Sequence, residues 1–354
     1  MKHVWPFYMG GFHCLREKCP SSCCKGMAIE IDEDSLARYL RESRPGGERI
    51  RKGINWREGV FYQEDGCLML TGEGLCYIWQ TFGEEELCDT CKNYPQHVED
   101  YPQVQEHSLC LSCPAVASLL FSAPYRVSEK AWRDEERDSY EYEEGEEELY
   151  LALSEERGKL LTFLEQEDLS LEEKAGHVLD TLFALQRAYD EGSFPGSYLP
   201  ASAPEKDRLF RVSSSLPALG DLCKGQRVAF SAWREELEWF DSLPKEKREE
   251  LSRSFLKQVS AWEEGDFSYE RAMSHLLSYY EAVFFAGATY TGEIYACGRL
   301  GLFAIAWQEK LLLSRYAQRG KITREDFEEA ACAFSRAIEH EDAILEQVLR
   351  SLAL

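Results

Sequence analysis

The chain has 354 residues, thirteen of them cysteine, and a formal net charge of −24 at pH 7. A chain of this length can bury one large or two ordinary cores, so its stability does not require disulfide cross-links. The negative charge argues against a nucleic-acid partner, because phosphates attract basic surfaces.

The N-terminal segment indicates where the protein resides. MKHVWPFYMGGFHC, residues 1–14, lacks the uninterrupted apolar stretch of a secretory signal, and the cysteine count is odd. The most apolar stretch, which begins at Ile294, carries Arg299, Glu309 and Lys310, which argues against a membrane span. We therefore expect a cytoplasmic protein with reduced thiols.

Ten of the thirteen cysteines fall in the first 113 residues, mostly in closely spaced pairs. Those pairs are Cys19 with Cys23, Cys67 with Cys76, Cys88 with Cys91, and Cys110 with Cys113. Cysteines a few residues apart can present both sulfurs to one metal ion. Thiolates bind zinc and iron–sulfur clusters alike, so the spacing leaves both kinds of site open.

The adjacent Cys23 and Cys24 pose a separate question. They belong to the stretch FHCLREKCPSSCCKGMAIEID, residues 12–32. Ten thiols exceed what one tetrahedral zinc can use, and neighbouring side chains in extended backbone point apart. One of the two is therefore expected to face a second site, to be packed, or to react. His13, His97 and His107 are expected to be surface or capping residues, which makes a mixed Cys/His site less favourable.

The rest of the chain reads as helical. Residues 170–192 open on a capping box, Ser170 to Glu173, and a second box, Thr323 to Asp326, opens the C-terminal segment. Two further segments, residues 247–265 and 268–287, each end at a glycine, which is typical of a helix C-terminus. The single cysteines Cys223, Cys297 and Cys332 lie in such helix-like surroundings and are expected to be small buried hydrophobes.

These patterns predict a mainly α fold with two parts. A cysteine-rich, metal-binding region of short strands and loops covers residues 1–125, and a helical body covers residues 126–354. Within the body, residues 129–157 hold 13 acidic against 4 basic side chains and are expected to form a solvated helix face or linker. Residues 192–219, rich in Pro, Ser and Gly, are the expected connector or lid.

Four stretches together resemble the flagellin lysine-N-methylase (FliB) family. They are residues 12–32, DGCLMLTGEGLCYIWQTFGEEELCDTCKNYPQ (65–96), EHSLCLSCPA (106–115) and AFSRAIEHEDAILEQVL (333–349). The resemblance implies transfer of methyl groups from S-adenosylmethionine to lysine ε-amines of flagellin or another lysine-bearing protein. It also implies a four-iron four-sulfur (4Fe-4S) cluster, with zinc as the alternative metal, and no nucleic-acid or membrane partner.

The same resemblance implies a set of metal ligands. Carried over position by position, they are Cys14, Cys19, Cys23, Cys24, Cys67, Cys76, Cys91 and Cys113. Cys88 and Cys110 stand where the family commonly has other residues. The sequence departs from the family pattern at Met27, Gln96 and Ala115, where Trp, Arg and Glu are usual.

Lysine methylation needs a group that accepts or orients the amine proton. A lysine side chain has a pKa near about 10.4, so at neutral pH it is mostly an ammonium without a free lone pair. Asp89, Tyr94 and Glu106 lie close to cysteines in the sequence and are the candidate catalytic residues.

Two other classes of protein fit the same thiols. A zinc-binding protein-interaction module would use the thiols structurally and would need no S-adenosylmethionine. A thiol redox sensor would need exposed thiols of low pKa.

Overall fold

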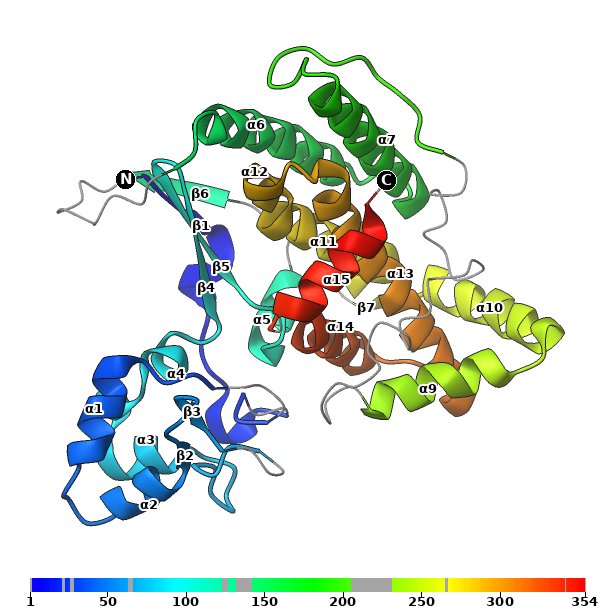
Figure 1. The fold of residues 1–354 in the computed structure, drawn as a ribbon. Helices are drawn as coiled ribbons and strands as arrows, with labels where there is room; N and C mark the ends of the chain where they lie inside the picture. The colour runs from blue at the N-terminus through cyan, green and yellow to red at the C-terminus, as the bar shows by residue number, and fades with distance from the viewer. Residues whose placement is uncertain are drawn as a thin grey trace.

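The computed structural model describes residues 2–20, 23–25, 29–62, 66–122, 127–131, 142–204, 231–264, 267–340 and 342–353. A small lobe and a larger helical body are connected through a narrow sheet (Figure 1). The mainly α fold is confirmed, and so is the expectation of short strands and loops in the cysteine-rich region followed by a helical body.

The sheet is assembled from three separate parts of the chain. Its strand order is β4-β5-β1-β6. The strands are β1 (Lys2–Pro6), β4 (Gln96–Tyr101), β5 (Val104–Leu109) and β6 (Val127–Ala131). β1 runs parallel to β5, with Lys2 opposite Val104, and antiparallel to β6, with Pro6 opposite Val127. The chain therefore leaves the sheet after β1, builds the lobe, and returns to the sheet at β4.

The lobe has a small core of its own. Its elements are α1 (Glu33–Arg41), α2 (Gly47–Lys52), β2 (Ile54–Asn55), β3 (Val60–Phe61), α3 (Tyr77–Phe82), the 3-10 helix η3 (Glu84–Glu86) and α4 (Asp89–Asn93). Asp32 caps α1 by accepting a hydrogen bond from the Ser35 N–H at 2.8 Å. Tyr39, Ile50 and Ile78 are each at most 2% exposed in this core.

Between β1 and the lobe the chain forms two short 3-10 helices, η1 (Phe7–Gly11) and η2 (Arg16–Lys18). Tyr8 packs into the core of the body, which holds the start of this segment against it. The Arg16 guanidinium lies 5.2 Å from the ring centroid of Trp79 in the lobe. The segment thus contacts the body at one end and the lobe at the other.

The body is a set of helices around one long central helix, α13 (Ile294–Arg319). The others are α5 (Pro114–Leu120), α6 (Glu146–Leu164), α7 (Leu171–Asp190), α9 (Ser231–Ser242), α10 (Lys245–Ser260), α11 (Tyr269–Phe284), α12 (Ala288–Thr291), α14 (Arg324–Ile338) and α15 (Asp342–Leu352). Two short strands, β7 (Glu263–Glu264) and β8 (Phe267–Ser268), and the 3-10 helix η6 (Phe285–Gly287) flank α11. α13 is buried on nearly all sides, as a helix enclosed by others must be, and its buried residues are mostly apolar.

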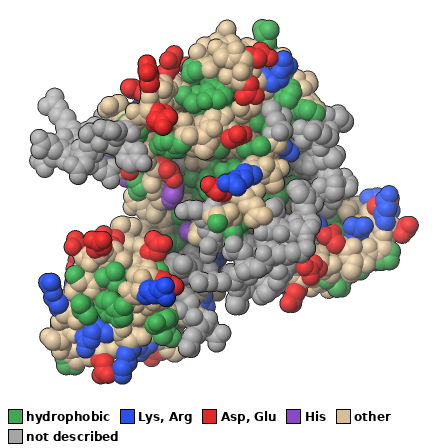
Figure 2. Space-filling view, viewed as in Figure 1, with side chains coloured by type: hydrophobic (Ala, Val, Ile, Leu, Met, Phe, Trp, Pro, Cys, Tyr) green, Lys and Arg blue, Asp and Glu red, His purple; other side chains and the backbone are tan. Residues whose placement is uncertain are grey.

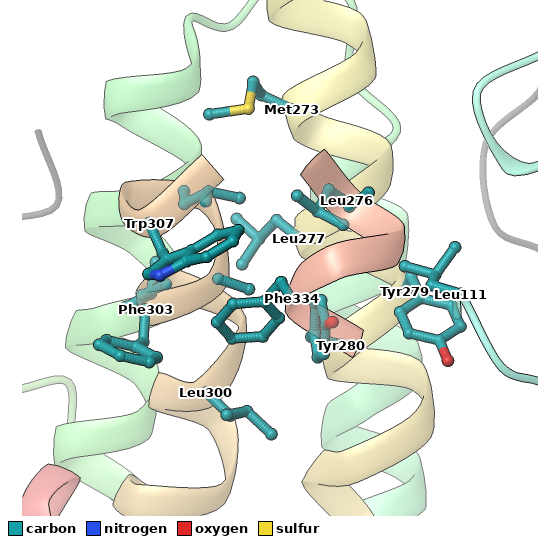
Figure 3. Packing of buried hydrophobic residues seen from close by; sticks show 14 of the residues in the cluster. Leu111, Met273, Leu276, Leu277, Tyr279, Tyr280, Leu300, Phe303, Trp307 and Phe334 are labelled. Carbon is teal, nitrogen blue, oxygen red and sulfur yellow. The ribbon is translucent and has the colours of Figure 1, made fainter. Parts of the chain in front are cut away.

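Figure 3 shows how α11, α13 and α14 interlock. Leu277 and Tyr280 of α11 face Phe303 and Trp307 of α13, and Phe334 of α14 lies between them. The ring centroids of Trp307 and Phe334 are 5.1 Å apart. These aromatic contacts fix α14, and with it the residues at its C-terminal end, against the centre of the body.

Both expected capping boxes are present. Ser170 and Glu173 open α7, and Thr323 and Asp326 open α14, with reciprocal side-chain to backbone hydrogen bonds in each. None of the helices that the structure describes combines the length and the hydropathy needed to span a bilayer.

The other expected segments are described in part. In the acidic stretch, residues 129–131 belong to β6 and residues 146–157 to α6, while residues 132–141 lie outside the described residues. Residues 193–204 follow α7 without regular structure, and residues 205–219 are not among those described. Cys297 and Cys332 are buried in the body, and Cys223 falls outside the described residues.

Candidate functional site

Five cysteines gather in the core of the lobe. We call Cys24, Cys67, Cys76, Cys88 and Cys91 the lobe thiols. Cys67 and Cys88 are buried members of the lobe core, and the other three pack against it. Local hydrogen bonds position them: the Cys67 N–H donates to the Cys24 carbonyl at 2.6 Å, and Cys88 is the N-cap residue of α4.

The lobe thiols affect one another electrostatically. Burial, with the nearby Cys24, Cys76 and Cys88, raises the pKa of Cys67 to about 12. A side-chain hydrogen bond between Cys88 and Cys91 lowers the pKa of Cys88, although burial opposes the shift. The same hydrogen bond, together with burial, raises the pKa of Cys91. Burial and mutual repulsion disfavour the thiolate forms of these cysteines. A bound cation would stabilise the thiolates by offsetting both effects.

A second group lies where the lobe meets the body. We call Cys14, Cys19, Cys23 and Cys113 the junction thiols. Cys113 belongs to the body core and is the N-cap residue of α5, without a capping hydrogen bond from its side chain. Burial raises the pKa of Cys113, and the neighbouring Cys19 and Cys14 thiols add to the shift.

The two adjacent cysteines divide between these groups. A side-chain hydrogen bond with Cys24 raises the pKa of Cys23, and the Cys14 and Cys113 thiols raise it further. Cys24 in turn raises the pKa of Cys67, Cys76 and Cys91 in the lobe. The lobe and junction thiols therefore meet at the Cys23–Cys24 pair.

None of the twelve cysteines in the described part of the chain forms a disulfide. Among those same residues, no three His, Cys, Asp or Glu side chains converge as the ligands of a single metal ion. The lobe thiols and the junction thiols nevertheless offer only sulfur ligands, and members of each group shift one another's pKa. Zinc and iron–sulfur clusters both bind thiolates of this kind. Metal binding would need the sulfurs of each group to draw together.

A chain of polar side chains runs beside the junction thiols. Tyr94 Oη lies 3.0 Å from Ser112 Oγ, and His340 Nε2 lies 2.7 Å from the same Ser112 oxygen. Arg336 donates from Nε to the Ser112 carbonyl at 3.1 Å. We call Tyr94, Ser112 and His340 the hydroxyl chain. It joins the end of α4, the loop before α5 and the end of α14.

Burial sets the protonation of the hydroxyl chain. It lowers the pKa of His340 to about 4, assisted by Arg336 and His97, so the imidazole is neutral near pH 7. Burial also raises the pKa of Tyr94, and the nearby Cys113 and Cys23 thiols act in the same direction. The phenol therefore keeps its proton. Beneath His340, Glu339 accepts hydrogen bonds from Tyr280 at 2.7 Å and Tyr279 at 3.3 Å.

The structure does not bring the three candidate catalytic residues together. Tyr94 belongs to the hydroxyl chain. Asp89 is exposed at the start of α4, where its N–H donates to the Asp32 carboxylate at 2.9 Å. Glu106 lies in β5, where it accepts hydrogen bonds from Arg157 Nη1 at 2.8 Å and from the Tyr150 hydroxyl. Its carboxylate therefore links the sheet to α6.

Ser112 and His340 were not singled out from the sequence as catalytic candidates. Ser112 stands between two cysteines of a C-x-x-C pair, and His340 lies 228 residues further along the chain. His340 belongs to residues 333–349, one of the four stretches that carry the family resemblance, and that was its only signal.

The departures from the family pattern fall in two different settings. The Gln96 amide nitrogen lies 2.9 Å from Nδ1 of His107, on the edge of the sheet. Ala115 is buried in the first turn of α5. Met27 lies outside the described residues.

A surface hollow of about 580 Å³ lies on the lobe, along α1 and the turn that follows it. Its walls are formed by Asp34, Ala37, Arg38, Arg41, Glu42, Ser43 and Arg44. Ligand pockets of this size usually have apolar and aromatic walls, which an adenine ring requires. The walls of this hollow carry no aromatic side chain on which an adenine ring could stack.

Comparison with curated proteins finds three similar Salmonella sequences. The lysine-N-methylases of Salmonella choleraesuis and Salmonella typhimurium are each 27% identical to this chain over 129 residues. The flagellar biosynthetic protein FliU of Salmonella muenchen is also 27% identical over 129 residues, which are 76% of its length. No family model and no solved structure matches the chain.

The shared segment is limited in extent. It covers 34% of this chain and 32% of each lysine-N-methylase, so the match spans about a third of the length of those two relatives. Two of the three relatives are nevertheless named for the same activity, methylation of lysine.

Proposed function

We propose that this protein transfers methyl groups from S-adenosylmethionine to lysine side chains of a protein substrate, flagellin or another lysine-bearing protein, and that its cysteines hold a 4Fe-4S cluster. The observation that carries the proposal is the similarity to two lysine-N-methylases. The proposal is also supported by the hydroxyl chain, whose Tyr94 lies within electrostatic range of Cys113 and Cys23.

The donor sets fit a bound metal–thiolate group. The ligands would come from the lobe thiols, the junction thiols or both, and all of them offer sulfur alone. Such a cluster can leave one iron open to the amino and carboxylate groups of the methyl donor. Cys113 and Cys23, whose thiols raise the pKa of Tyr94, would be among the ligands.

The hydroxyl chain can orient a lysine amine. Because His340 is neutral near pH 7, its Nε2 can accept a hydrogen bond from Ser112, which in turn can accept one from Tyr94. Because Tyr94 donates its hydroxyl proton to Ser112, the lone pairs of Tyr94 Oη can accept a hydrogen bond from an N–H of the substrate amine. Once the ammonium has lost its proton to solvent, that contact would aim the nitrogen lone pair at the donated methyl group.

Charge favours a lysine-bearing partner. Residues 116–354 hold 28 basic and 46 acidic side chains, a balance of −18, which is the difference between the whole chain and its first 115 residues. Figure 2 shows acidic side chains interspersed with Lys and Arg on the face in view. A surface of this sign attracts a basic substrate and steers its approach.

The pKa shifts do not favour a thiol redox sensor. Such sensors need thiols of low pKa that solvent can reach. Burial raises the pKa of Cys67, Cys76 and Cys113. Cys88, whose pKa is lowered, is completely buried.

The proposal is tested with the full chain purified without oxygen and incubated with S-adenosylmethionine and purified flagellin. Intact-mass and peptide mass spectrometry should find methyl groups on flagellin lysines, and none when the methyl donor is omitted. If flagellin stays unmodified, a panel of other lysine-bearing proteins is tested in the same way. Absence of methylated lysine on every substrate, with the chain folded and loaded with metal, would overturn the proposed activity.

A further inference from the structure

β4 lies at one edge of the four-stranded sheet. In the order β4-β5-β1-β6 it pairs with β5 alone, and it begins two residues after Tyr94. The narrow sheet that contains it connects the lobe to the body (Figure 1). An edge strand presents backbone N–H and C=O groups with which another extended chain can pair.

The pairing of β4 with β5 shows which backbone groups point outward. The Cys110 N–H donates to the Pro95 carbonyl at 2.8 Å, so these two residues form a hydrogen-bonded pair. Hydrogen-bonded and non-hydrogen-bonded pairs alternate along an antiparallel ladder. The next pair, Gln96 with Leu109, is therefore not hydrogen-bonded. Gln96, and Val98 two residues further on, thus direct their N–H and C=O groups away from β5.

The outward groups of Gln96 and Val98 are open to a partner. Within the described ranges, the backbone of neither residue bonds to anything on this side of β4. The next outward carbonyl, that of Asp100, accepts a hydrogen bond from the Tyr290 hydroxyl, so α12 closes that end of the edge. The Val98 side chain is 39% exposed, and β4 contains neither the lysine nor the proline that commonly blocks pairing at an edge.

The charge of the β4–β5 hairpin favours a basic partner. Residues 96–109 contain Glu99, Asp100 and Glu106 and neither Lys nor Arg. Arg157 neutralises Glu106, whereas the Glu99 side chain is 41% exposed and Asp100 is exposed. Pairing of β4 with β4 of a second copy would bring two hairpins of the same negative charge together. A lysine-bearing segment has the complementary charge.

A strand added beside β4 would direct alternate side chains to the two faces of the sheet. One face is turned to the body, because Tyr101 stacks on Tyr150 of α6 with ring centroids 4.6 Å apart. His97 lies on the same face as Tyr101, and it is close enough to His340 to contribute to the lowering of that residue's pKa. Tyr94 packs against the body core. A substrate side chain opposite His97 therefore lies on the same side of the sheet as the hydroxyl chain.

We propose that β4 binds an extended, basic segment of the protein substrate as an added antiparallel strand, and that this pairing brings a lysine of the segment to Tyr94. The inference rests on the proposed function for the identity of the substrate. The backbone groups of Gln96 and Val98 hold the segment. The reactive lysine lies opposite His97, and the residues before and after it point to the other face, beside the Val98 side chain.

The first test measures binding and does not require catalysis. Short overlapping peptides that cover flagellin, each labelled with fluorescein, are titrated with the full chain and followed by fluorescence anisotropy. Hydrogen-exchange mass spectrometry then compares the free chain with the chain bound to the tightest peptide. Exchange in residues 96–101 should slow, and exchange in α13 should not change. Binding without protection of β4, or no binding by any peptide, would overturn the proposal.

Methylation of the peptide backbone distinguishes strand pairing from other modes of binding. The residues on either side of the lysine donate their N–H groups to the carbonyls of Gln96 and Val98, whereas the lysine N–H points away from β4. N-methylation of a flanking residue should therefore weaken binding about threefold to tenfold, the effect of losing one hydrogen bond. N-methylation of the lysine itself should have little effect. Equal losses at both positions, or a loss only at the lysine, would contradict antiparallel pairing.

A matched pair of variants tests the edge from the protein side. Val98→Pro removes an outward N–H without breaking a bond to β5, and should raise the Kd for the peptide about threefold to tenfold. Val98→Thr keeps the N–H and should bind like the wild type. Circular dichroism checks that both variants are folded, and the N-methylated peptides decide if Val98→Pro is not. A folded Val98→Pro with wild-type affinity would count against strand addition.

A second pair of variants tests the charge. Glu99→Gln with Asp100→Asn should weaken binding of the basic peptide and reduce its dependence on salt, because the attraction is electrostatic. Glu191→Gln removes an exposed acid of α7 and should leave the affinity unchanged. An equal effect of the two changes would show that the charge of the hairpin does not select the partner.

Failure of this inference and failure of the proposed function give different results. Lysine methylation without protection of β4 would overturn strand addition and leave the activity intact. Protection of β4 by a lysine-bearing peptide without methyl transfer would do the reverse. Without peptide, a dimer in analytical ultracentrifugation with slowed exchange in residues 96–101 would identify a second copy as the occupant and also overturn the proposal.

Discussion

Tyr94 is the residue whose surroundings best match a role in catalysis. Its hydroxyl is 3.0 Å from Ser112, which is 2.7 Å from a neutral His340, and the junction thiols lie within electrostatic range. Asp89 and Glu106 lack such surroundings. Asp89 is exposed, and Glu106 is held by Arg157 and Tyr150.

Tyr94→Phe is expected to slow methyl transfer by about tenfold to a hundredfold, because the amine loses the oxygen that orients it. Metal content and thermal stability should stay close to those of the wild type, since the ring is kept. The rate is measured with saturating S-adenosylmethionine and a lysine-bearing substrate. Tyr316→Phe is the control: it removes a similar tyrosine–serine contact, 2.8 Å to Ser254, far from the thiols in the fold. Equal rates in the two variants would contradict the role of Tyr94.

Glu281 carries a buried carboxyl group that should make the stability of the protein depend on pH. It is fully buried on α11, neither oxygen has a hydrogen-bond partner among the described residues, and burial raises its pKa well above the usual value. The unfolded chain ionises this group near about pH 4.3. Stability therefore falls as the pH rises above that value, until the folded-state pKa is reached.

Glu281→Met is expected to raise the free energy of unfolding at pH 7 by about 1 to 3 kcal/mol, the cost of a buried unpaired polar group. The gain should shrink as the pH is lowered toward 4, where the unfolded chain also keeps the proton. Urea unfolding at several pH values measures the gain in the free energy of unfolding and its dependence on pH. Glu309→Met, which loses a hydrogen bond from Tyr269 at 3.1 Å, should destabilise instead. A less stable Glu281→Met at every pH would show that the carboxyl is satisfied.

At the scale of elements, Glu106 connects β5 to the helices. Arg157 of α6 donates to the Glu106 carboxylate and to the Ala282 carbonyl of α11 at 2.9 Å, and both ends of the ion pair are largely buried. One pair thus joins the sheet to two helices of the body.

Glu106→Ala should lower the free energy of unfolding by about 3 to 5 kcal/mol, because it leaves the Arg157 charge buried without its counter-ion. Transfer activity per folded molecule should persist, which separates a structural role from a catalytic one. The comparison is Glu191→Ala, which breaks an exposed pair with Arg187 and should change stability little. If Glu106→Ala has the same free energy of unfolding as the wild type, the Glu106–Arg157 pair does not contribute to stability.

Local patterns predicted individual helices well and their limits less well. The capping boxes at Ser170 and Thr323 were readable because all their partners lie within three residues. The helix expected to run to Gly265 ends at Ser260, because Glu263–Glu264 pair with Phe267–Ser268 in a short hairpin. The next helix ends at Phe284, and Gly287 belongs to the 3-10 turn that continues it.

Long-range pairings were not readable from the sequence. β1 pairs with strands more than 100 residues away, and nothing in five residues of KHVWP specifies those partners. The contact of Ser112 with His340 is equally distant in sequence. The cysteine spacing predicted which residues could bind metal, but only the fold shows how they divide between the lobe and the body.

At the scale of the molecule, the lobe and the body differ in how much apolar material stabilises them. The lobe core has few buried residues besides its cysteines, whereas the body core extends through α5, α7, α11, α13 and α14. If the lobe thiols bind metal as proposed, the stability of the lobe should depend on that metal far more than the stability of the body does.

Removal of metal by a chelator is expected to increase amide hydrogen exchange in α1 to α4 by at least tenfold, while α11 and α13 keep their protection. Hydrogen-exchange mass spectrometry of loaded and stripped protein measures both regions in one experiment. Restoring the metal should restore the protection of the lobe. Equal protection of α1 to α4 in stripped and loaded protein would show that the lobe is stable without metal.

The position of β1 between β5 and β6 imposes an order on synthesis. Residues 2–6 cannot complete their sheet until residues 104–109 and 127–131 have left the ribosome, whereas the lobe is finished once residue 93 has emerged. All five lobe thiols are available by then, but the junction group lacks Cys113. The cysteines thus become available in two stages, first the five lobe thiols in the growing lobe and later Cys113, when the strands that deliver it are in place.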